Sequence, residues 1–447
     1  MINTKPKRRV LKMLIGVFLC AIFSSSKAQT GFQIYNSQPS TQVRFMERNN
    51  LVIIPLTINN KVTLRFVLDT GVRGIILTEK VFADRIGLKL ERNVTTPAPG
   101  REDSISAYVV NDIEIMLPAI PKDIITTTGN DFSLALGETY DLTNVQIANP
   151  GVIAKHQSMT VLKEDYLKLT ESLGVEVYGI IGYPLFRQFV IEIDRNEKVL
   201  TFYEPDGYKA PNFMEKLPLE IVNSKPYIDS KVTISDDKQI DTKLLVDLGA
   251  SHAVLLNRST SEEINLPAKT LYGILGHGLG GEIQGYVGRL QKFSIHDFEF
   301  EEVIGSYPDS AYYQGSIEFD KRNGTIGGEI LTRFNTTFDY LNGSFYLTKS
   351  VNYKRRFDHN MTGIEFRLAG QELDKMLVTN VRLGSPAADA GVIFGDLITK
   401  VNRFKVGSDT FGFINDLFRS KEGKKISLKV TRGAEELDLE FRLQKQI

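Results

Sequence analysis

Two short stretches of the chain place an aspartate at the same point behind an apolar run. Residues 66–71 read Phe-Val-Leu-Asp-Thr-Gly, and residues 244–249 read Leu-Leu-Val-Asp-Leu-Gly. Apolar runs of this kind are typical of buried strands, while aspartate and glycine are common where a strand enters a turn. Either stretch alone would be weak evidence. Because Asp69 and Asp247 recur in one frame, 178 residues apart, the sequence predicts two carboxylates at the ends of two buried strands.

The likeness extends well beyond the two aspartates. At the same offset Ile86 falls on Ile264, and no gap is needed over about forty positions. Further along, residues 180–189 match residues 325–334 at an offset of 145. The alternative explanation is a coincidental alternation of apolar residues in two β-rich segments. The register held around both motifs favours an internal repeat.

The shorter offset means that the first copy contains 33 extra residues. Residues 129–177 are the expected location of this extra chain, because the matching positions before and after it keep their register. Within it, the apolar spacing of residues 162–173 predicts a short helix.

Apolar-apolar-Asp-Thr-Gly, followed in each half by apolar-apolar-Gly, resembles the pepsin and retropepsin aspartic proteases. The resemblance covers roughly residues 33–349. It implies a mainly β fold in which two retropepsin-like β-barrel lobes, residues 29–207 and 208–350, are related by a pseudo-two-fold. Each lobe would supply one aspartate to a shared cleft.

Two neighbouring carboxyl groups suit the hydrolysis of peptide bonds without a metal. At about 3 Å apart they cannot both ionise cheaply, so they share one proton. The ionised member can accept a proton from water while the protonated member donates to the carbonyl oxygen. Asp69 and Asp247 are the predicted catalytic pair. Thr70, Gly71 and Gly249 are expected to contribute to substrate binding, and the two glycines let the backbone approach the carboxylates.

The second motif departs from the family pattern. In the family the hydroxyl after each aspartate braces the opposite lobe, but Leu248 has no hydroxyl, so the brace is expected to be at most half made. Val72 is also larger than the Ala or Ser usual at its position. These departures leave a second function open, namely a catalytically silent protein that retains the cleft and binds peptides.

A glycine-rich stretch, residues 276–285, follows the second motif. Each glycine adds backbone freedom, which suits a mobile hairpin that closes over a bound chain. Gly278, Gly280 and Gly281 are therefore expected to contribute to substrate binding. A phosphate-binding loop is the alternative, but no Lys-Ser/Thr pair follows and no helix clearly begins after it.

Residues 360–447 form a different unit, whose order of segments is similar to the PDZ domains of secreted bacterial proteases. Such domains bind an extended peptide beside an exposed strand and hold its terminal carboxylate on backbone N–H groups. By this resemblance Gly363, Ile364, Glu365 and Phe366 form the carboxylate loop. The alternative is a small β-rich cap packed on the lobes.

The first 28 residues read as a secretory signal: a basic start, an apolar run over residues 13–23 and a small residue at Ala28. Export to the periplasm or beyond, with cleavage near Ala28, is expected. An uncleaved anchor and lipidation at Cys20 are the alternatives. Cys20 is the only cysteine and would leave with the signal, so no disulfide is expected. From Gln29 onward the net charge is −6, because six basic residues and no acidic ones are removed from a balance of 54 and 54.

Other chemistries find little support in the sequence. No Gly-Asp-Ser-Gly-Gly-like nucleophile is present, and the five histidines are scattered, which disfavours a trypsin-like serine protease. His252 and His277 are expected to form local hydrogen bonds. No metal motif occurs, no cofactor is expected, and the absence of a basic stripe argues against nucleic acid. The sequence thus predicts an exported aspartic endopeptidase whose PDZ domain recruits peptide or protein substrates, and a monomer, since one chain carries both aspartates.

Overall fold

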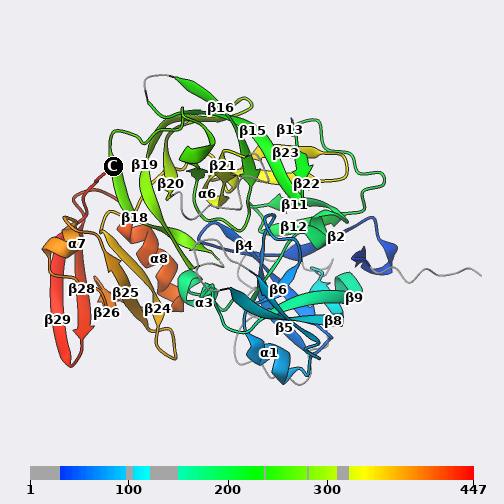
Figure 1. The fold of residues 1–447 in the computed structure, drawn as a ribbon, viewed down its shortest axis with the longest axis horizontal. Helices are drawn as coiled ribbons and strands as arrows, with labels where there is room; N and C mark the ends of the chain where they lie inside the picture. Colours follow the sequence, from blue (N-terminus) through cyan, green and yellow to red (C-terminus); the bar gives the residue numbers. More distant parts are fainter. Residues whose placement is uncertain (1–30, 97–103, 121–149, 236–237, 279–280, 310–321) are drawn as a thin grey trace, which may run out of the picture.

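The computed structural model describes residues 31–96, 104–120, 150–235, 238–278, 281–309 and 322–447. Strands dominate these residues, as predicted, and form four sheets (Figure 1). Three of the sheets build the body of the molecule, and the fourth lies in a C-terminal unit. Following the sequence, residues up to 207 are called the first half of the body and residues 208–350 the second half.

The first-half sheet contains nine strands. In spatial order they are β1 (Gln33–Ile34), β9 (Pro150–Leu162), β6 (Ile75–Leu77), β10 (Gly179–Ile181), β5 (Val62–Leu68), β4 (Leu51–Ile58), β8 (Ile105–Pro118) and β7 (Arg92–Thr96), with β3 (Met46–Arg48) paired to β4.

The second-half sheet contains eight strands. In spatial order they are β14 (Glu220–Val222), β15 (Lys225–Thr233), β16 (Gln239–Val246), β21 (Gly324–Ile326), β17 (Val254–Leu256), β20 (Phe298–Pro308), β19 (Gly281–Ile295) and β18 (Thr270–Gly278).

The two sheets pair their central strands in the same way. In the first half β5 runs parallel to β10, which is antiparallel to β6. In the second half β16 runs parallel to β21, which is antiparallel to β17. Both strands that lead to an aspartate, β5 and β16, are therefore held inside a sheet and end at equivalent points. The pseudo-two-fold relation between the halves remains a prediction.

A third sheet, here called the joining sheet, takes three strands from each half. In spatial order they are β13 (Glu215–Pro218), β23 (Ser344–Lys349), β22 (Phe334–Asp339), β11 (Val190–Asp194), β12 (Val199–Tyr203) and β2 (Ser40–Arg44). The halves meet where β11 pairs with β22, with Ile191 opposite Phe338. Phe186 of the first half packs edge-on against Phe338, with ring centroids 5.3 Å apart, so the two halves share one hydrophobic core.

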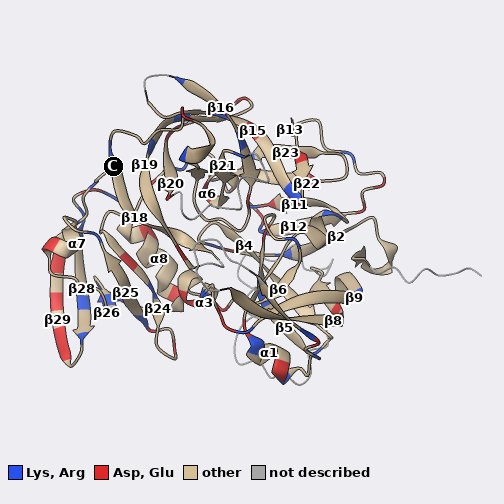
Figure 2. Cartoon of the chain, viewed as in Figure 1, with Lys and Arg blue, Asp and Glu red and all other residues tan. Residues whose placement is uncertain are grey.

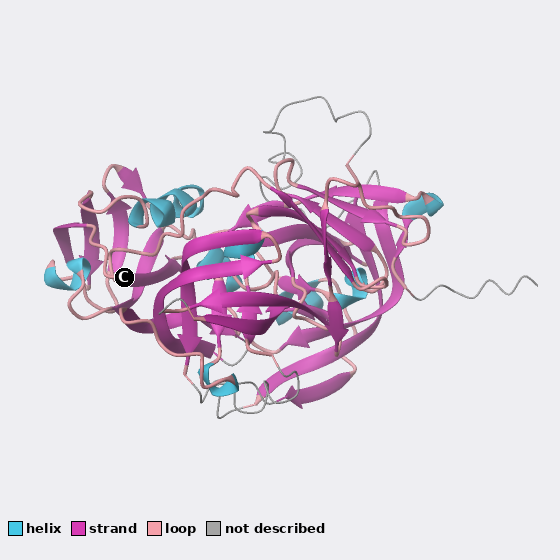
Figure 3. Ribbon diagram, turned by 90° about the horizontal axis from the view of Figure 1, so that it is seen from above, coloured by secondary structure: helices cyan, strands magenta, loops and turns pink. Residues whose placement is uncertain are grey.

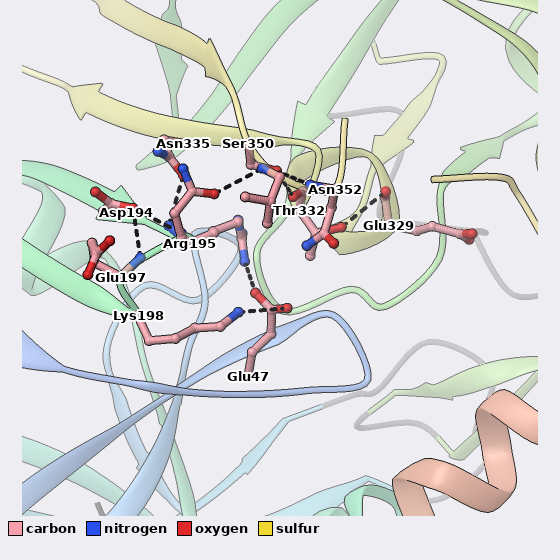
Figure 4. Close-up of polar contacts among 12 residues, drawn as sticks. Glu47, Asp194, Arg195, Glu197, Lys198, Glu329, Thr332, Asn335, Ser350 and Asn352 are labelled. Carbon is pink, nitrogen blue, oxygen red and sulfur yellow. Dashed lines mark hydrogen bonds and ion pairs between the residues drawn. The ribbon is translucent and has the colours of Figure 1, made fainter. Parts of the chain in front are cut away.

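A buried ion pair fixes the first half to the joining sheet (Figure 4). Arg195, in the turn between β11 and β12, is fully buried, and its guanidinium lies 2.7 Å from the Glu47 carboxylate on β3. The backbone N–H of Arg195 also donates to Asn335 Oδ1 in the second half, at 2.9 Å. Lys198 reaches the same carboxylate from the surface, at 3.2 Å.

Helices are short and few in the described chain. The helical segments are η1 (Tyr35–Ser37), α1 (Lys80–Arg85), α3 (Leu169–Leu173), α4 (Tyr183–Phe186), η3 (Arg258–Thr260), α6 (Gly328–Leu331), α7 (Pro386–Asp389) and α8 (Ser408–Phe418). The helix predicted over residues 162–173 is wrong in its first part, because Leu162 is the last residue of β9 and pairs with Ala107 of β8. Only its last turn, α3, is helical. No helix among the described residues is long and apolar enough to cross a membrane.

The C-terminal unit has a sheet and a hydrophobic core of its own, and it lies beside the body (Figure 3). Its strands are β24 (Ile364–Ala369), β25 (Lys375–Val381), β26 (Leu397–Val401), β28 (Lys425–Arg432) and β29 (Glu435–Arg442), with β27 (Phe404–Lys405) paired to β26. One edge of this sheet, β29, is rich in acidic residues (Figure 2). Charge on an edge strand discourages pairing with other chains. The opposite edge, β24, faces the body.

Candidate active site

Each predicted aspartate lies directly after a buried strand and is held in the same local geometry. The Asp69 N–H donates to the Ile181 carbonyl, and the Asp247 N–H donates to the Ile326 carbonyl, both at 2.9 Å. These bonds continue the parallel pairing of β5 with β10 and of β16 with β21 by one residue. Each carboxylate therefore has its backbone fixed by a sheet while its side chain is only partly buried.

Each carboxylate also accepts a hydrogen bond from the glycine two residues further on. The Gly71 N–H donates to Asp69 Oδ1 at 2.6 Å, and the Gly249 N–H donates to Asp247 Oδ1 at 2.9 Å. Short side chains that accept from the backbone two residues ahead are typical of turns after strands. The two turns thus orient both carboxylates by the same device.

The structure brings the two carboxyl groups together, because a Cβ built on Gly71 would lie close to both, 3.0 Å from Asp69 Oδ1 and 3.4 Å from Asp247 Oδ1. Burial, and then the neighbouring negative charge of Asp247, raise the pKa of Asp69 well above its ordinary value. A carboxyl group with a raised pKa keeps its proton at a pH at which an exposed one would lose it. The pair can therefore hold one proton between two carboxylates.

The glycines of the two motifs make this approach possible. A Cβ on Gly249 would lie 2.3 Å from both Cγ and Oδ2 of Asp69, closer than real Cβ contacts occur. A Cβ on Gly71 would lie 3.4 Å from Asp247 Oδ1 and 3.0 Å from Asp69 Oδ1, which is tight but less severe. The glycine of each motif thus leaves room for the carboxylate of the other motif. The space beside Gly249 is tighter than the space beside Gly71.

Thr70 joins the two turns from the side of the first half. Its side chain is 1% exposed, and its Oγ1 donates to the Val246 carbonyl at 2.6 Å and accepts from the Leu248 N–H at 3.0 Å. Leu248 occupies the equivalent position in the second motif, where its apolar side chain is buried in the shared core. One hydroxyl therefore makes the brace alone, as the sequence led us to expect.

The apolar-apolar-Gly segments pack against the two turns that hold the aspartates. The Tyr183 N–H donates to the Val72 carbonyl at 2.9 Å, and the Gly328 N–H donates to the Ala250 carbonyl at 2.6 Å. A Cβ on Gly182 would lie 2.1 Å from the Asp69 carbonyl oxygen, so a side chain at this position would push the first aspartate away. The larger Val72 is partly buried and packs against a cluster of buried apolar residues that includes Val67 of β5.

Tyr340 and His252 lie near the pair, and sequence reasoning did not assign either to the site. Burial, followed by the charges of Asp69 and Asp247, raises the pKa of Tyr340, whose ring stacks on Phe186 at 5.2 Å. Its hydroxyl is buried without a hydrogen-bond partner among the described residues. Burial lowers the pKa of His252 to about 4, although the charge of Asp247 acts in the opposite direction. His252 hydrogen bonds to the backbone of Thr325, which agrees with the local role expected for it.

The glycine-rich stretch forms the predicted hairpin, made of β18 and β19. Gly278 pairs with Gly281, whose φ of +106° favours glycine, and Gly280 lies outside the described residues. The backbone N–H of Ile274, in β18, donates to Glu365 Oε1 of the C-terminal unit at 3.1 Å. Contact between the hairpin and a substrate remains a prediction.

The four residues expected to hold a peptide carboxylate lie at the start of β24. Gly363 has a φ of +81°, and a Cβ there would lie 2.1 Å from the Ser385 Cβ, so only glycine fits. The Ile364 N–H already donates to Thr362 Oγ1 at 3.0 Å. Glu365 contacts the hairpin, and the Phe366 ring packs edge-on against Phe418 of α8. Their role in binding a carboxylate remains a prediction.

Comparison with known families identifies the two kinds of domain. Residues 230–329 match the family described as aspartyl protease, and residues 361–443 match the family described as PDZ domain. The first match includes Asp247 but not Asp69. The chain therefore contains an aspartyl protease domain and a C-terminal PDZ domain, as predicted from the sequence, and the matches support a PDZ-containing protease.

Individual relatives cover only parts of the chain or share little sequence with it. Curated proteins named probable CtpA-like serine protease, from several strains of Staphylococcus aureus, are 34% identical over 106 residues, which is 23% of this chain and 21% of theirs. The chain thus spans about one fifth of the length of these relatives. Basic 7S globulin from soybean is 9% identical, with a TM-score of 0.37 over 71% of this chain and 97% of that one. An aminopeptidase N family protein from Idiomarina loihiensis is 19% identical, with a TM-score of 0.19 over 21% and 15% of the two chains.

Proposed function

We propose that the protein is an aspartic endopeptidase in which Asp69 and Asp247 act together on a water molecule. The observation that carries the proposal is the close approach of the two carboxyl groups, each of which lies against the glycine of the other motif. Burial and the charge of Asp247, which raise the pKa of Asp69, agree with it. Two carboxylates held in contact for a purely structural purpose would be costly, because partly buried like charges repel each other. Both strands, both turns and both glycines serve to bring them together.

The reaction follows from one proton shared by two carboxyl groups. The ionised carboxylate accepts a proton from water as the water oxygen bonds to the peptide carbonyl carbon. The protonated carboxyl donates its proton to the carbonyl oxygen, which gives a neutral tetrahedral intermediate. Collapse of this intermediate breaks the C–N bond: the carboxyl that is now protonated donates its proton to the leaving amine, and the other carboxylate accepts a proton from a hydroxyl of the intermediate as the carbonyl re-forms. The pair again holds one proton. Which carboxyl holds the proton at the start is a property of the pair.

The remaining parts of the chain suggest how substrates reach this site. The PDZ domain is proposed to bind extended peptide segments and so recruit protein substrates. The basic and apolar start of the chain supports export, and a monomer is sufficient because one chain supplies both aspartates.

A peptide-cleavage assay over a range of pH tests the proposal. Asp69→Asn and Asp247→Asn should each reduce kcat/KM by at least about 1,000-fold, since each removes a proton-transfer group. Asp241→Asn is the matched control, because Asp241 is exposed on β16, the same strand that leads to Asp247. Activity that survives both substitutions would exclude the pair. Loss of that surviving activity on treatment with a serine-directed fluorophosphonate would favour a serine protease.

A catalytically silent peptide-binding protein is the second candidate. The observation that favours it is Leu248, which leaves the brace to Thr70 alone. Peptides that bind with equal affinity to the wild-type chain and to Asp69→Asn, with no cleavage at any pH, would support this candidate.

A further inference from the structure

We propose that the groove between β24 and α8 of the PDZ domain is occupied by α3 of the same chain, and that a peptide entering this groove displaces α3 and releases the β18–β19 hairpin. The ligand is an extended peptide with a free carboxyl terminus. Any consequence for cleavage rests on the proposed function, whereas the contacts and the binding experiments below do not.

β24 forms one edge of the PDZ sheet. Among the described strands it pairs with β25 alone, so its other side can accept a further strand. α3 lies against β24, on the side away from β25 (Figure 1). Gly174, the residue that ends α3, is buried against Phe411 of α8: a Cβ on Gly174 would lie 2.5 Å from the Phe411 ring. The α3 segment therefore contacts both elements that line the groove.

The floor of the groove is aromatic and continuous with this contact. Phe366 of β24 packs edge-on against Phe411, with ring centroids 5.8 Å apart, and against Phe418 at 5.5 Å. Gly174 covers the Phe411 end of this cluster. A peptide that adds to β24 needs the same space, so the peptide and α3 exclude each other.

α3 also packs against the body. Leu173 is 5% exposed and packs in an apolar cluster with Val67 of β5, two residues before Asp69. The partly buried Val72, which follows the same motif, contacts this cluster. α3 lies in the region of extra chain that distinguishes the first half from the second. It therefore shares an apolar cluster with the strand of the first aspartate and also contacts the PDZ domain.

The PDZ domain also contacts the hairpin. β18 is an edge strand of the second-half sheet, and its Ile274 N–H is held by Glu365, the second residue of β24. A peptide that adds to β24 as a further strand lies beside the Glu365 carboxylate. Peptide binding in the groove should therefore weaken the hydrogen bond from the Ile274 N–H of β18 to Glu365.

Hydrogen–deuterium exchange on the full chain tests the coupling. All variants carry Asp69→Asn, so the readout is independent of catalysis. Gly174→Ala should raise exchange about fivefold or more in residues 364–369 and also in residues 270–278, because both segments lose protection when α3 undocks. Gly87→Ala is the matched control: both glycines have a φ of +70°, but nothing lies within 4 Å of a Cβ on Gly87. An increase confined to 364–369 would overturn the coupling. No increase in either segment, or the same increase in Gly87→Ala, would overturn the occupancy.

Glu365→Ala tests the hold on the hairpin without touching α3. It should raise exchange in residues 270–278 and leave residues 166–175 unchanged, while Glu365→Gln, which keeps an acceptor oxygen, should have a smaller effect. Glu372→Ala, at an exposed position in the same domain, should change neither. Unchanged exchange of 270–278 in Glu365→Ala would overturn the proposed hold.

Peptide binding tests the exclusion directly. The probe is a pooled library of ten-residue peptides with free carboxyl termini, and the same library with amidated termini serves as control. Gly174→Ala should retain about tenfold more of the free-carboxyl library than Gly87→Ala, because a groove that is seldom vacant binds with reduced apparent affinity. Equal retention by the two variants, or retention by neither, would overturn the proposal.

Discussion

Thr70 and Leu248 stand at the same position of two matching motifs, and the hydroxyl of Thr70 accepts a hydrogen bond from the backbone N–H of Leu248 at 3.0 Å. The same hydroxyl donates to the Val246 carbonyl at 2.6 Å. Leu248 returns no such bond and contributes apolar burial instead. The Thr70 hydroxyl thus bridges the two turns that hold the aspartates, with no matching hydroxyl at Leu248.

Removal of the Thr70 hydroxyl should therefore weaken the whole body. Thr70→Val keeps the shape but leaves a buried N–H and a buried carbonyl without partners, and should lower the free energy of unfolding by about 2–4 kcal/mol. Thr70→Ser keeps both hydrogen bonds and should cost about 1 kcal/mol. Urea unfolding measures both. Equal stability of the two variants would contradict the brace.

Substitution of the two motif glycines should have unequal effects. Gly249→Ala places a methyl group 2.3 Å from the Asp69 carboxyl, whereas Gly71→Ala places one 3.4 Å from the nearest Asp247 oxygen. If the proposed function holds, Gly249→Ala should reduce kcat/KM by about 100-fold more than Gly71→Ala, since small misplacements of reacting groups are costly. Steady-state kinetics measures this difference, and the reverse order would contradict the geometry.

Asp69 should make the protein less stable as the pH rises. Its folded pKa is raised, so between the unfolded pKa of about 3.9 and the folded value the folded state binds more protons than the unfolded state. Stability from this group is present below pH 4 and lost as the pH rises through the folded pKa. Asp69→Asn should therefore gain stability relative to wild type between pH 4 and pH 7, in urea unfolding. Asp241→Asn should show no such trend.

His252 should act in the opposite direction. Its pKa is lowered from 6.5 to about 4, so the unfolded state binds more protons in this window and stability falls as the pH drops through it. Relative to His252→Gln, wild type should lose at most about 3 kcal/mol between pH 6.5 and pH 4. Burial also lowers the pKa of His359 to about 4, so wild type should show a similar loss relative to His359→Gln. His296→Gln, at an exposed position, is the control, and a parallel pH profile for wild type and His252→Gln would contradict the prediction.

The buried ion pair of Arg195 and Glu47 should be costly to break from one side. Glu47→Gln leaves a fully buried guanidinium without its charged partner and should destabilise the protein by about 3–5 kcal/mol. The double variant Glu47→Gln with Arg195→Met should recover part of this loss. Lys198→Met removes only the partly exposed cation and should cost less than about 1 kcal/mol. A double-mutant cycle from urea unfolding checks the three values, and additive losses would contradict the pairing.

The site was predictable from sequence where a local pattern repeats. An apolar strand ending in Asp-x-Gly, found twice, was enough to predict that Asp69 and Asp247 meet and that Thr70 braces alone. The helix over residues 162–173 was partly wrong because a short apolar run does not distinguish a strand from a helix, and pairing with β8 decides for a strand at Leu162.

Other contacts depend on how distant segments dock, and no local pattern encodes them. Tyr340 follows β22 in an ordinary turn sequence, and only the packing of the joining sheet places it near the pair. Glu365 lies in a segment that resembles a peptide-binding loop. It nevertheless accepts a hydrogen bond from the Ile274 N–H, because the PDZ domain lies against the edge of another sheet.

The pairing of β11 with β22 restricts how the two halves of such a chain can evolve. Main-chain hydrogen bonds cross from one half to the other in the middle of the joining sheet, and side chains of both halves fill one core. Neither half could be released as an independent subunit without exposing that sheet along a newly opened edge. The two halves of such a chain cannot be exchanged between molecules. Substitutions in one half must therefore remain compatible with the packing of the other half.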